Sequence, residues 1–172
     1  PPTPPPPSPP PPPYAFTSKA ALKTAVQAYD ANPTAAIATY GLIADWDVSA
    51  ITDMSGLFKG LKDFNADISN WDTSSVTNMD QMFYGASVFD QPLSFDNSSV
   101  TTMGHMFRSA SAFNQPLSFD TSSVTNMYGM FYVRSSPCPA PSLQSRPLLH
   151  AACATVVHRL LPPDPYTSPR TA

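Results

Sequence analysis

The sequence contains no glutamate, so every acidic side chain is an aspartate. Charged residues make up only 12% of the 172 residues, about half the usual share, which argues against binding nucleic acid through charge. No apolar run approaches the roughly 20 residues of a membrane span. Glycine-rich phosphate loops, Walker sequences and H-E-x-x-H are also missing. We therefore expect a non-enzymatic chain with no cofactor, no metal site, no nucleic-acid partner and no membrane span.

Cysteine is scarce as well. Cys138 and Cys153 are the only two, and they lie near the C-terminus with His150 and His158 in the same segment. Their spacing does not match that of a zinc site. We therefore interpret them as free or loosely paired thiols.

Proline is abundant, with 22 residues concentrated at the two ends of the chain. Residues 1–13 are almost entirely proline, which predicts an extended polyproline linker without internal hydrogen bonds. Residues 133–172 are rich in proline and arginine and contain no repeat, so we expect a disordered tail or a misassembled splice or reading frame. The foldable part is predicted to consist of a helical cap over residues 14–45 and repeats over residues 46–132.

A repeat of 24 residues, with one extra in the first copy, fills residues 46–132 about three and a half times. Each copy begins with an aromatic residue and an aspartate, followed at fixed spacing by Ile or Val, by Met and by Phe. The opening aromatic residues are Trp46, Trp71, Phe95 and Phe119. One copy has too few apolar residues to form a core alone, so stacked copies must share one continuous core.

The spacing within a copy indicates its local structure. Val76, Met79, Met82 and Phe83 fit one face of a short helix over residues 78–86. The residues 93–95 alternate between apolar and polar, as in a strand. We therefore predict an α/β repeat solenoid, similar to a leucine-rich repeat, with short parallel strands and short helices. A helix of about 14 residues, starting at Ser18 and ended by Asn32-Pro33, is expected to cap it.

The strings YGLIADWDVSAITDMSGLF and FNQPLSFDTSSVTNM resemble the BspA-like leucine-rich-repeat surface proteins. The repeat of that family is written W-D-[VT]-S-x-V-T-x-M-x-x-M-F, and the resemblance covers about residues 15–132. It implies a solenoid, an extracellular or cell-surface location, and adhesion to a protein or glycan. It supplies no catalytic residue.

Four residues are candidates for a binding face. Ser94 and Ser118 lie between apolar residues of the alternating segments, and Tyr84 and Arg108 occupy a variable position directly after a phenylalanine. His105 also occupies a variable position, which indicates the surface rather than catalysis. Asn97-Ser98-Ser99 is an N-glycosylation sequence, so Asn97 is a candidate for modification.

One aspartate recurs in each copy, directly after the opening aromatic residue. These residues are Asp47, Asp72, Asp96 and Asp120. Oxygen ligands in a row are compatible with a calcium site. However, each aspartate has a Ser or Thr close after it in the sequence, and aspartate, serine and threonine side chains bond nearby backbone amides in turns. Turn capping is therefore the favoured interpretation.

The expected function is that of a surface or secreted repeat protein that binds an unknown protein or glycan. Two alternatives stay open at this point. An intracellular interaction scaffold would be distinguished by a full-length gene without a signal sequence. An accessory binding module of a larger protein would be distinguished by a further domain encoded upstream.

Overall fold

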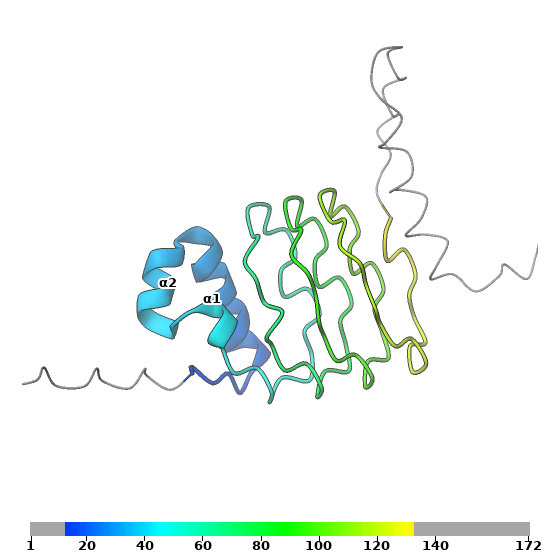
Figure 1. Cartoon of the computed structure of the whole chain (residues 1–172), viewed down its shortest axis with the longest axis horizontal. Helices are drawn as coiled ribbons and strands as arrows, with labels where there is room; N and C mark the ends of the chain where they lie inside the picture. Colours follow the sequence, from blue (N-terminus) through cyan, green and yellow to red (C-terminus); the bar gives the residue numbers. More distant parts are fainter. Residues whose placement is uncertain (1–12, 133–172) are drawn as a thin grey trace, which may run out of the picture. The chain divides into compact units, whose positions relative to one another are not determined.

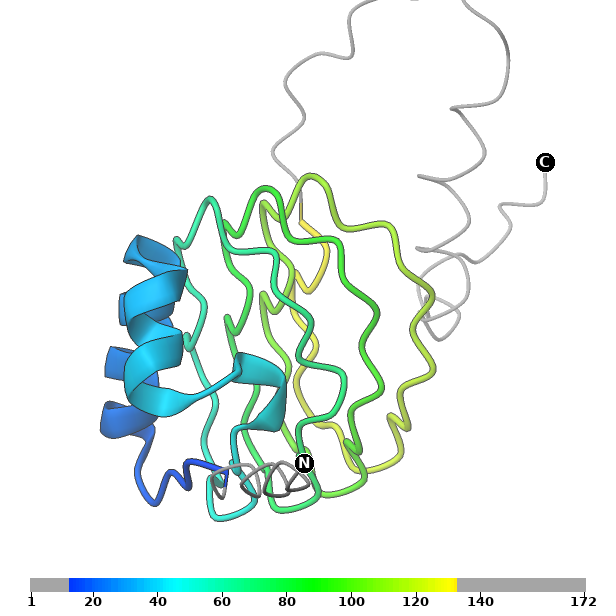
Figure 2. The same ribbon diagram turned by 60° about the vertical axis from the view of Figure 1, so that its left-hand side comes forward.

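A computed structural model describes residues 13–132, in which two helices precede a series of repeat copies (Figure 1). The predicted polyproline linker (apart from its last residue), the predicted tail and both cysteines lie outside the described residues. Seen from a second direction, the copies form successive loops that lie side by side (Figure 2). We call them copy 1 (46–70), copy 2 (71–94), copy 3 (95–118) and copy 4 (119–132).

Helix α1 spans Lys19–Ala31 and starts directly after Ser18, as predicted. The Ser18 hydroxyl accepts a hydrogen bond from the Ala21 N–H at 3.3 Å, which satisfies a free amide of the first turn. Leu22, Ala25 and Val26 are buried and join the same core as copy 1. The helix therefore covers the first end of the repeat core.

A second helix, which was not predicted, follows at once. Helix α2 spans Pro33–Tyr40 and a short 3-10 turn, η1, spans Ile43–Asp45. Asn32 ends α1, and its side chain accepts a hydrogen bond from the Ala35 N–H at 3.1 Å, which starts α2. Within residues 13–132, no helix is long and apolar enough to cross a membrane.

The prediction of an α/β solenoid with short parallel strands and short helices is wrong. Over residues 46–132 the structure contains turns and bends but no strand and no helix. Strand-like pairing between neighbouring copies there is limited to isolated parallel bridges, which pair Asp53 with Asn78, Asn78 with Thr102, and Thr102 with Asn126.

The hydrogen bonds of the backbone explain why neither element forms. Alternate amides point to the next copy: Met54, Gly56 and Phe58 each donate across at 2.9 Å. The amide between the last two, that of Leu57, instead closes a turn on the Met54 carbonyl at 3.2 Å. A helix would require bonds four residues back along the chain. The helical spacing of the apolar residues therefore comes from a series of three-residue turns.

Positive backbone φ angles interrupt the chain at the same place in every copy. The residues are Gly56 (58°), Gln81 (56°), His105 (54°) and Gly129 (61°). This left-handed conformation is incompatible with a continuing helix or strand. In copies 2 and 3 it is occupied by residues other than glycine, so the sequence does not reveal it.

The apolar residues form the predicted columns along a shared core. Phe83 stacks between Phe58 at 5.0 Å and Phe107 at 5.4 Å, measured between ring centroids. A second phenylalanine column has centroid spacings of 6.0 Å, and Trp46 stacks on Trp71 at 6.3 Å. The shared core was predicted correctly, although the backbone that carries it was not.

The segment around Ser94 shows the predicted alternation without the predicted strand. Leu93 and Phe95 are buried, and Ser94 between them is exposed. Next to this segment, side chains join the copies: Asp90 N–H donates to Asn65 Oδ1 at 3.0 Å, and Asn114 N–H donates to Asp90 Oδ1 at 2.9 Å. Because amide and carboxylate side chains accept these bonds, the backbones do not pair there.

Candidate binding surface

Cationic and aromatic side chains alternate along one edge of the repeats, at the position directly after the first phenylalanine column. We call this set the cation–aromatic column, and it consists of Lys59, Tyr84, Arg108 and Tyr132. Lys59 Nζ lies 5.0 Å from the centroid of the Tyr84 ring. The Arg108 guanidinium lies 5.6 Å from the Tyr84 centroid and 4.9 Å from the Tyr132 centroid. Cations at such distances are attracted to the ring faces.

The backbone holds the column in place. The amides of Gly60, Gly85 and Ser109 donate to the carbonyls of Tyr84, Arg108 and Tyr132, at 2.8, 2.8 and 3.1 Å. Each column residue from copy 2 onward is therefore tied to the copy before it. Apart from the residues on either side of it in the chain, no atom lies within 4 Å of the position that a methyl group on Gly60 would occupy, so no other part of the described chain covers the surface there.

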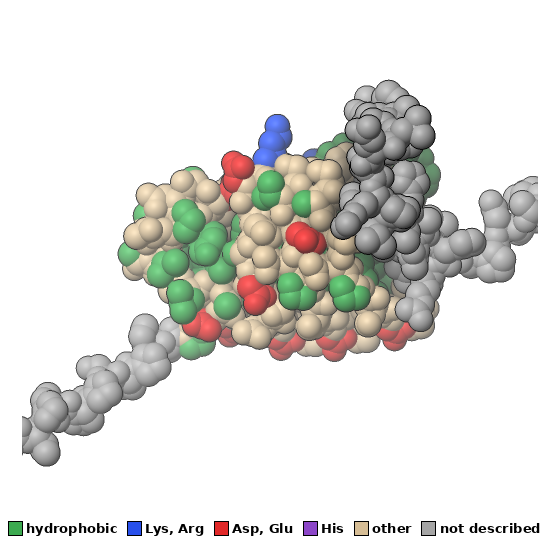
Figure 3. All heavy atoms as spheres, turned by 45° about the horizontal axis from the view of Figure 1, so that its top comes forward, with side chains coloured by type: hydrophobic (Ala, Val, Ile, Leu, Met, Phe, Trp, Pro, Cys, Tyr) green, Lys and Arg blue, Asp and Glu red, His purple; other side chains and the backbone are tan. Residues whose placement is uncertain are grey.

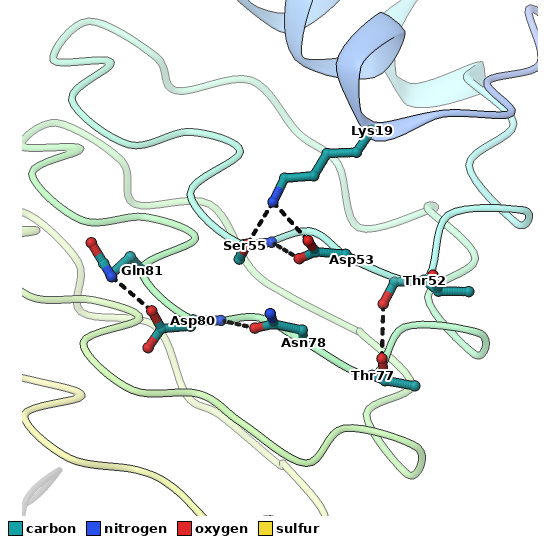
Figure 4. Close-up of polar contacts among 8 residues, drawn as sticks. All are labelled: Lys19, Thr52, Asp53, Ser55, Thr77, Asn78, Asp80 and Gln81. Carbon is teal, nitrogen blue, oxygen red and sulfur yellow. Dashed lines mark hydrogen bonds and ion pairs between the residues drawn. The ribbon is translucent and has the colours of Figure 1, made fainter.

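Lys59 is also the first member of a polar chain. Its ammonium donates to Gln81 Oε1 at 2.7 Å, and Gln81 Nε2 donates to Asp80 Oδ2 at 2.7 Å. Figure 4 shows Gln81 directed toward Asp80, with the Lys19 contact to copy 1 nearby. Within residues 13–132 the only ion pair closer than 4.0 Å joins Lys19 to Asp53. Lys59 and Arg108 therefore have no carboxylate in direct contact there.

The four predicted face residues are divided between two places. Tyr84 and Arg108 touch each other in the column. Ser94 and Ser118 are exposed, but no hydrogen bond or ring contact joins them to those two residues within the described part of the chain. Lys59 was not among the predicted face residues, although it occupies the same repeat position as the other three members of the column.

Asn97 occupies a different environment from the one expected of a glycosylation site. The residue is 3% exposed, and its side chain binds both backbone groups of Asp120 in the next copy. Asn97 Nδ2 donates to the Asp120 carbonyl, and Asn97 Oδ1 accepts from the Asp120 N–H at 3.0 Å. Glycosylation stays a prediction, but a sugar on Nδ2 would require the two copies to separate here.

The recurring aspartates cap turns, as favoured from the sequence. Asp47 Oδ1 accepts from the Ser49 hydroxyl at 2.7 Å and from the Ser49 N–H at 3.0 Å, and Asp72 and Asp96 bind Ser74 and Ser98 in the same way. The serine hydroxyl and amide hold the pKa of Asp47 below its ordinary value. Figure 3 shows acidic side chains in a row along the lower edge of the repeats.

No group of three or more metal-ligating side chains comes together within residues 13–132. His105 is half-buried, and its ring contacts the Tyr128 ring edge-on with centroids 5.2 Å apart. The cation–aromatic column is therefore the candidate binding surface of the described residues, and it offers hydrogen-bond donors and ring surfaces to a partner.

Comparison with known proteins gives one result. No curated protein and no solved structure matches the sequence. The sequence model of one protein family matches residues 16–139, which include α1, α2 and all four copies. That family is described as "Mycoplasma protein of unknown function, DUF285". Since the match spans most of the chain, the protein belongs to the DUF285 family.

Proposed function

We propose that this chain is a non-enzymatic, BspA-like surface or secreted protein, and that it binds a protein or glycan partner through the cation–aromatic column. The observation that carries the proposal is the alignment of Lys59, Tyr84, Arg108 and Tyr132 along one edge, one residue from each copy. Tyrosine and arginine are enriched where proteins bind partners, since both offer a large contact area together with hydrogen-bond donors.

The geometry supports a binding role in a second way. The column residues are ordered before any partner arrives, because ring contacts and backbone bonds already fix them. Pre-ordered side chains lose less conformational entropy on binding than free ones. The outermost member, Tyr132, is 53% exposed and so leaves ring surface available to a partner.

The test is a binding screen of the purified chain against immobilised matrix proteins and glycans. We expect at least one partner whose binding the double variant Tyr84→Ala/Arg108→Ala weakens at least tenfold, as expected for central interface residues worth about 1.4 kcal/mol or more. The matched control is Ser94→Ala/Ser118→Ala, which alters the other two predicted residues and should retain binding. Binding that depends on the serine pair instead would contradict the proposed surface.

The surface location needs its own measurement. Antibodies against residues 46–132 should label intact cells of the source organism, or detect the chain in its culture medium. Labelling that appears only after the cells are permeabilised would contradict the proposal and favour an intracellular scaffold.

A further inference from the structure

We infer that the cation–aromatic column recognises an anionic polysaccharide, carboxylated or sulfated, lying across the copies. This inference rests on the proposed binding function and names the chemical class of its partner. The first argument is the donor chemistry of the column. Lys59, Arg108 and the two tyrosine hydroxyls supply N–H and O–H donors, and carboxylates or sulfates accept charge-assisted hydrogen bonds from such groups.

The second argument concerns charge. Neither Lys59 nor Arg108 contacts a carboxylate within residues 13–132, where the one ion pair is made by Lys19 of the helical cap. Lys59 is connected to an acid only indirectly, by hydrogen bonds through Gln81 to Asp80. An anion that reaches the column therefore has no internal salt bridge to displace.

The third argument is the arrangement of the rings. Tyr84 lies against Lys59 at 5.0 Å and Arg108 at 5.6 Å. Both cations occupy ring surface, so a sugar ring has little of the Tyr84 face on which to stack. What Tyr84 offers is its edge and hydroxyl, which favours contact through polar and charged groups over stacking of a neutral sugar.

The fourth argument is regularity. Successive column residues are one copy apart, and copies linked by parallel bridges are spaced by about 4.8 Å. The two cations therefore recur at every second position along a straight row. A stiff linear polysaccharide carries its anionic groups at regular intervals and loses little entropy on binding such a row. An acidic peptide would have to order its backbone residue by residue.

The test measures binding of the full chain to four soluble polymers: polygalacturonate, dextran sulfate, neutral dextran and poly-L-glutamate. We expect polygalacturonate or dextran sulfate to bind at least tenfold more tightly than both neutral dextran and poly-L-glutamate, with affinity falling as salt increases. The two anionic glycans distinguish carboxylate from sulfate recognition. Equal binding of neutral dextran, or tighter binding of poly-L-glutamate, would overturn the inference.

Variants locate the binding. Arg108→Gln should weaken binding of the preferred polymer about tenfold and Lys59→Gln about fivefold, in line with lost charge-assisted hydrogen bonds. Arg108→Lys keeps the charge but not the planar group between two rings, and should weaken binding about threefold. Lys23→Gln makes the same charge change on α1 and should alter affinity less than twofold. An equal loss in Lys23→Gln would overturn the inference, because it would show attraction to overall charge.

The outcome is separable from that of the proposed function. A chain that binds matrix proteins or neutral glycans through Tyr84 and Arg108, but neither anionic polymer, keeps the proposed function and refutes the anionic polysaccharide. Unchanged thermal unfolding of each variant shows that a loss of affinity is not a loss of folding.

Discussion

The two ends of the repeat region contain equivalent residues in unequal surroundings. At the first end, α1 and the residues before it cover copy 1, and Trp46 is 3% exposed beside the Phe16 ring at 5.0 Å. At the other end, the equivalent Phe119 is only half-buried. The burial of a repeat residue is therefore decided by its neighbouring copy rather than by its own copy.

The covered end is also held by directional contacts. Trp71 Nε1 donates to the Ile43 carbonyl at 2.8 Å, and Lys19 Nζ binds Asp53 at 2.9 Å. In copy 4, several apolar side chains are half-buried although their equivalents in copies 1 to 3 are buried: Val124, Met127 and Phe131. The comparison predicts a gradient of stability along the chain.

The largest expected effect compares two residues of the same phenylalanine column. Phe83→Ala removes a fully buried ring and should lower the free energy of unfolding by about 3–5 kcal/mol. Phe131→Ala removes a half-buried ring with one stacking neighbour, Phe107, and should cost about 1–2 kcal/mol. Denaturant unfolding measures both. Tyr128→Ala, at an exposed position, is the control, and equal losses at 83 and 131 would contradict the gradient.

The contact between copies 3 and 4 is the next target. Asn97→Leu leaves the backbone groups of Asp120 without their partner and should cost about 1–3 kcal/mol. Amide hydrogen exchange should accelerate mainly at residues that bind copy 4, such as His105, whose N–H donates to the Tyr128 carbonyl at 2.8 Å. Thr73→Val removes the matching bond of copy 2 to the Asp96 carbonyl and serves as the comparison. Faster exchange confined to copy 1 would refute this assignment.

A substitution is also expected to stabilise the chain when it gives an inner copy the residue found at the same position in an outer copy. His105 has a φ of 54°, and Gly129 fills the equivalent position in copy 4. His105→Gly removes about 1 kcal/mol of backbone strain and should raise the melting temperature. Gly56→Ala, the reverse change in copy 1, should lower stability by about 1 kcal/mol, because alanine is strained at the φ of 58° found there. A methyl group there would meet only ordinary contacts at 3.8 Å, so the backbone conformation is the cause. If both substitutions raised stability, or both lowered it, the interpretation that positive φ strains this repeat position would be contradicted.

The smallest expected effect concerns the ion pair between α1 and copy 1. Lys19→Met should lower stability by about 0.2–1 kcal/mol, since the two side chains are 32% and 43% exposed and water screens the pair. Lys23→Met is the control. Burial opposes the charge of Asp53, but hydrogen bonds from Lys19 and Ser55 together hold its pKa below its ordinary value.

The pH dependence of the Lys19–Asp53 pair follows from the direction in which the pKa of Asp53 is shifted. Because the pKa of Asp53 is lowered in the folded chain, its contribution is present above the ordinary aspartate pKa of 3.8. It is lost as the pH falls through the folded value. Stability should therefore fall less steeply with acid in Lys19→Met than in the unaltered chain. Denaturant unfolding at a series of acidic pH values measures this slope. An equally steep fall in stability in both chains would exclude the ion pair as the cause.

The sequence was a good guide to the core and a poor guide to the backbone. Repeating apolar positions predicted the Phe58–Phe83–Phe107 column, and Ser18 predicted the start of α1. The spacing of Val76, Met79 and Met82 led to the wrong prediction of a short helix, because three-residue turns also place side chains on one face. Gln81 and His105 gave no sign of positive φ, since this conformation is uncommon for residues other than glycine.

Of the four residues predicted for a binding face, only Tyr84 and Arg108 are brought into contact by the structure. Tyr84 and Arg108 were found from their variable position, while Ser94 and Ser118 were assigned to the same face without evidence of proximity. The alternation of cationic and aromatic residues at one repeat position becomes visible only when the copies are aligned residue by residue. Read that way, Lys59 belongs with the other three members.

The alternating direction of the backbone amides has a consequence for how such chains change over generations. Every inner copy offers the same donors to its follower and the same acceptors to its predecessor, as in the bonds of Met54 to Asn78 and of Met79 to Thr102. Gain or loss of one whole inner copy by unequal recombination would therefore leave no mismatched bond at the new junction. Insertions within the segment whose amides cross between copies, such as residues 54–58, would break this register. Larger differences in length among descendants of this gene should therefore come as whole repeats.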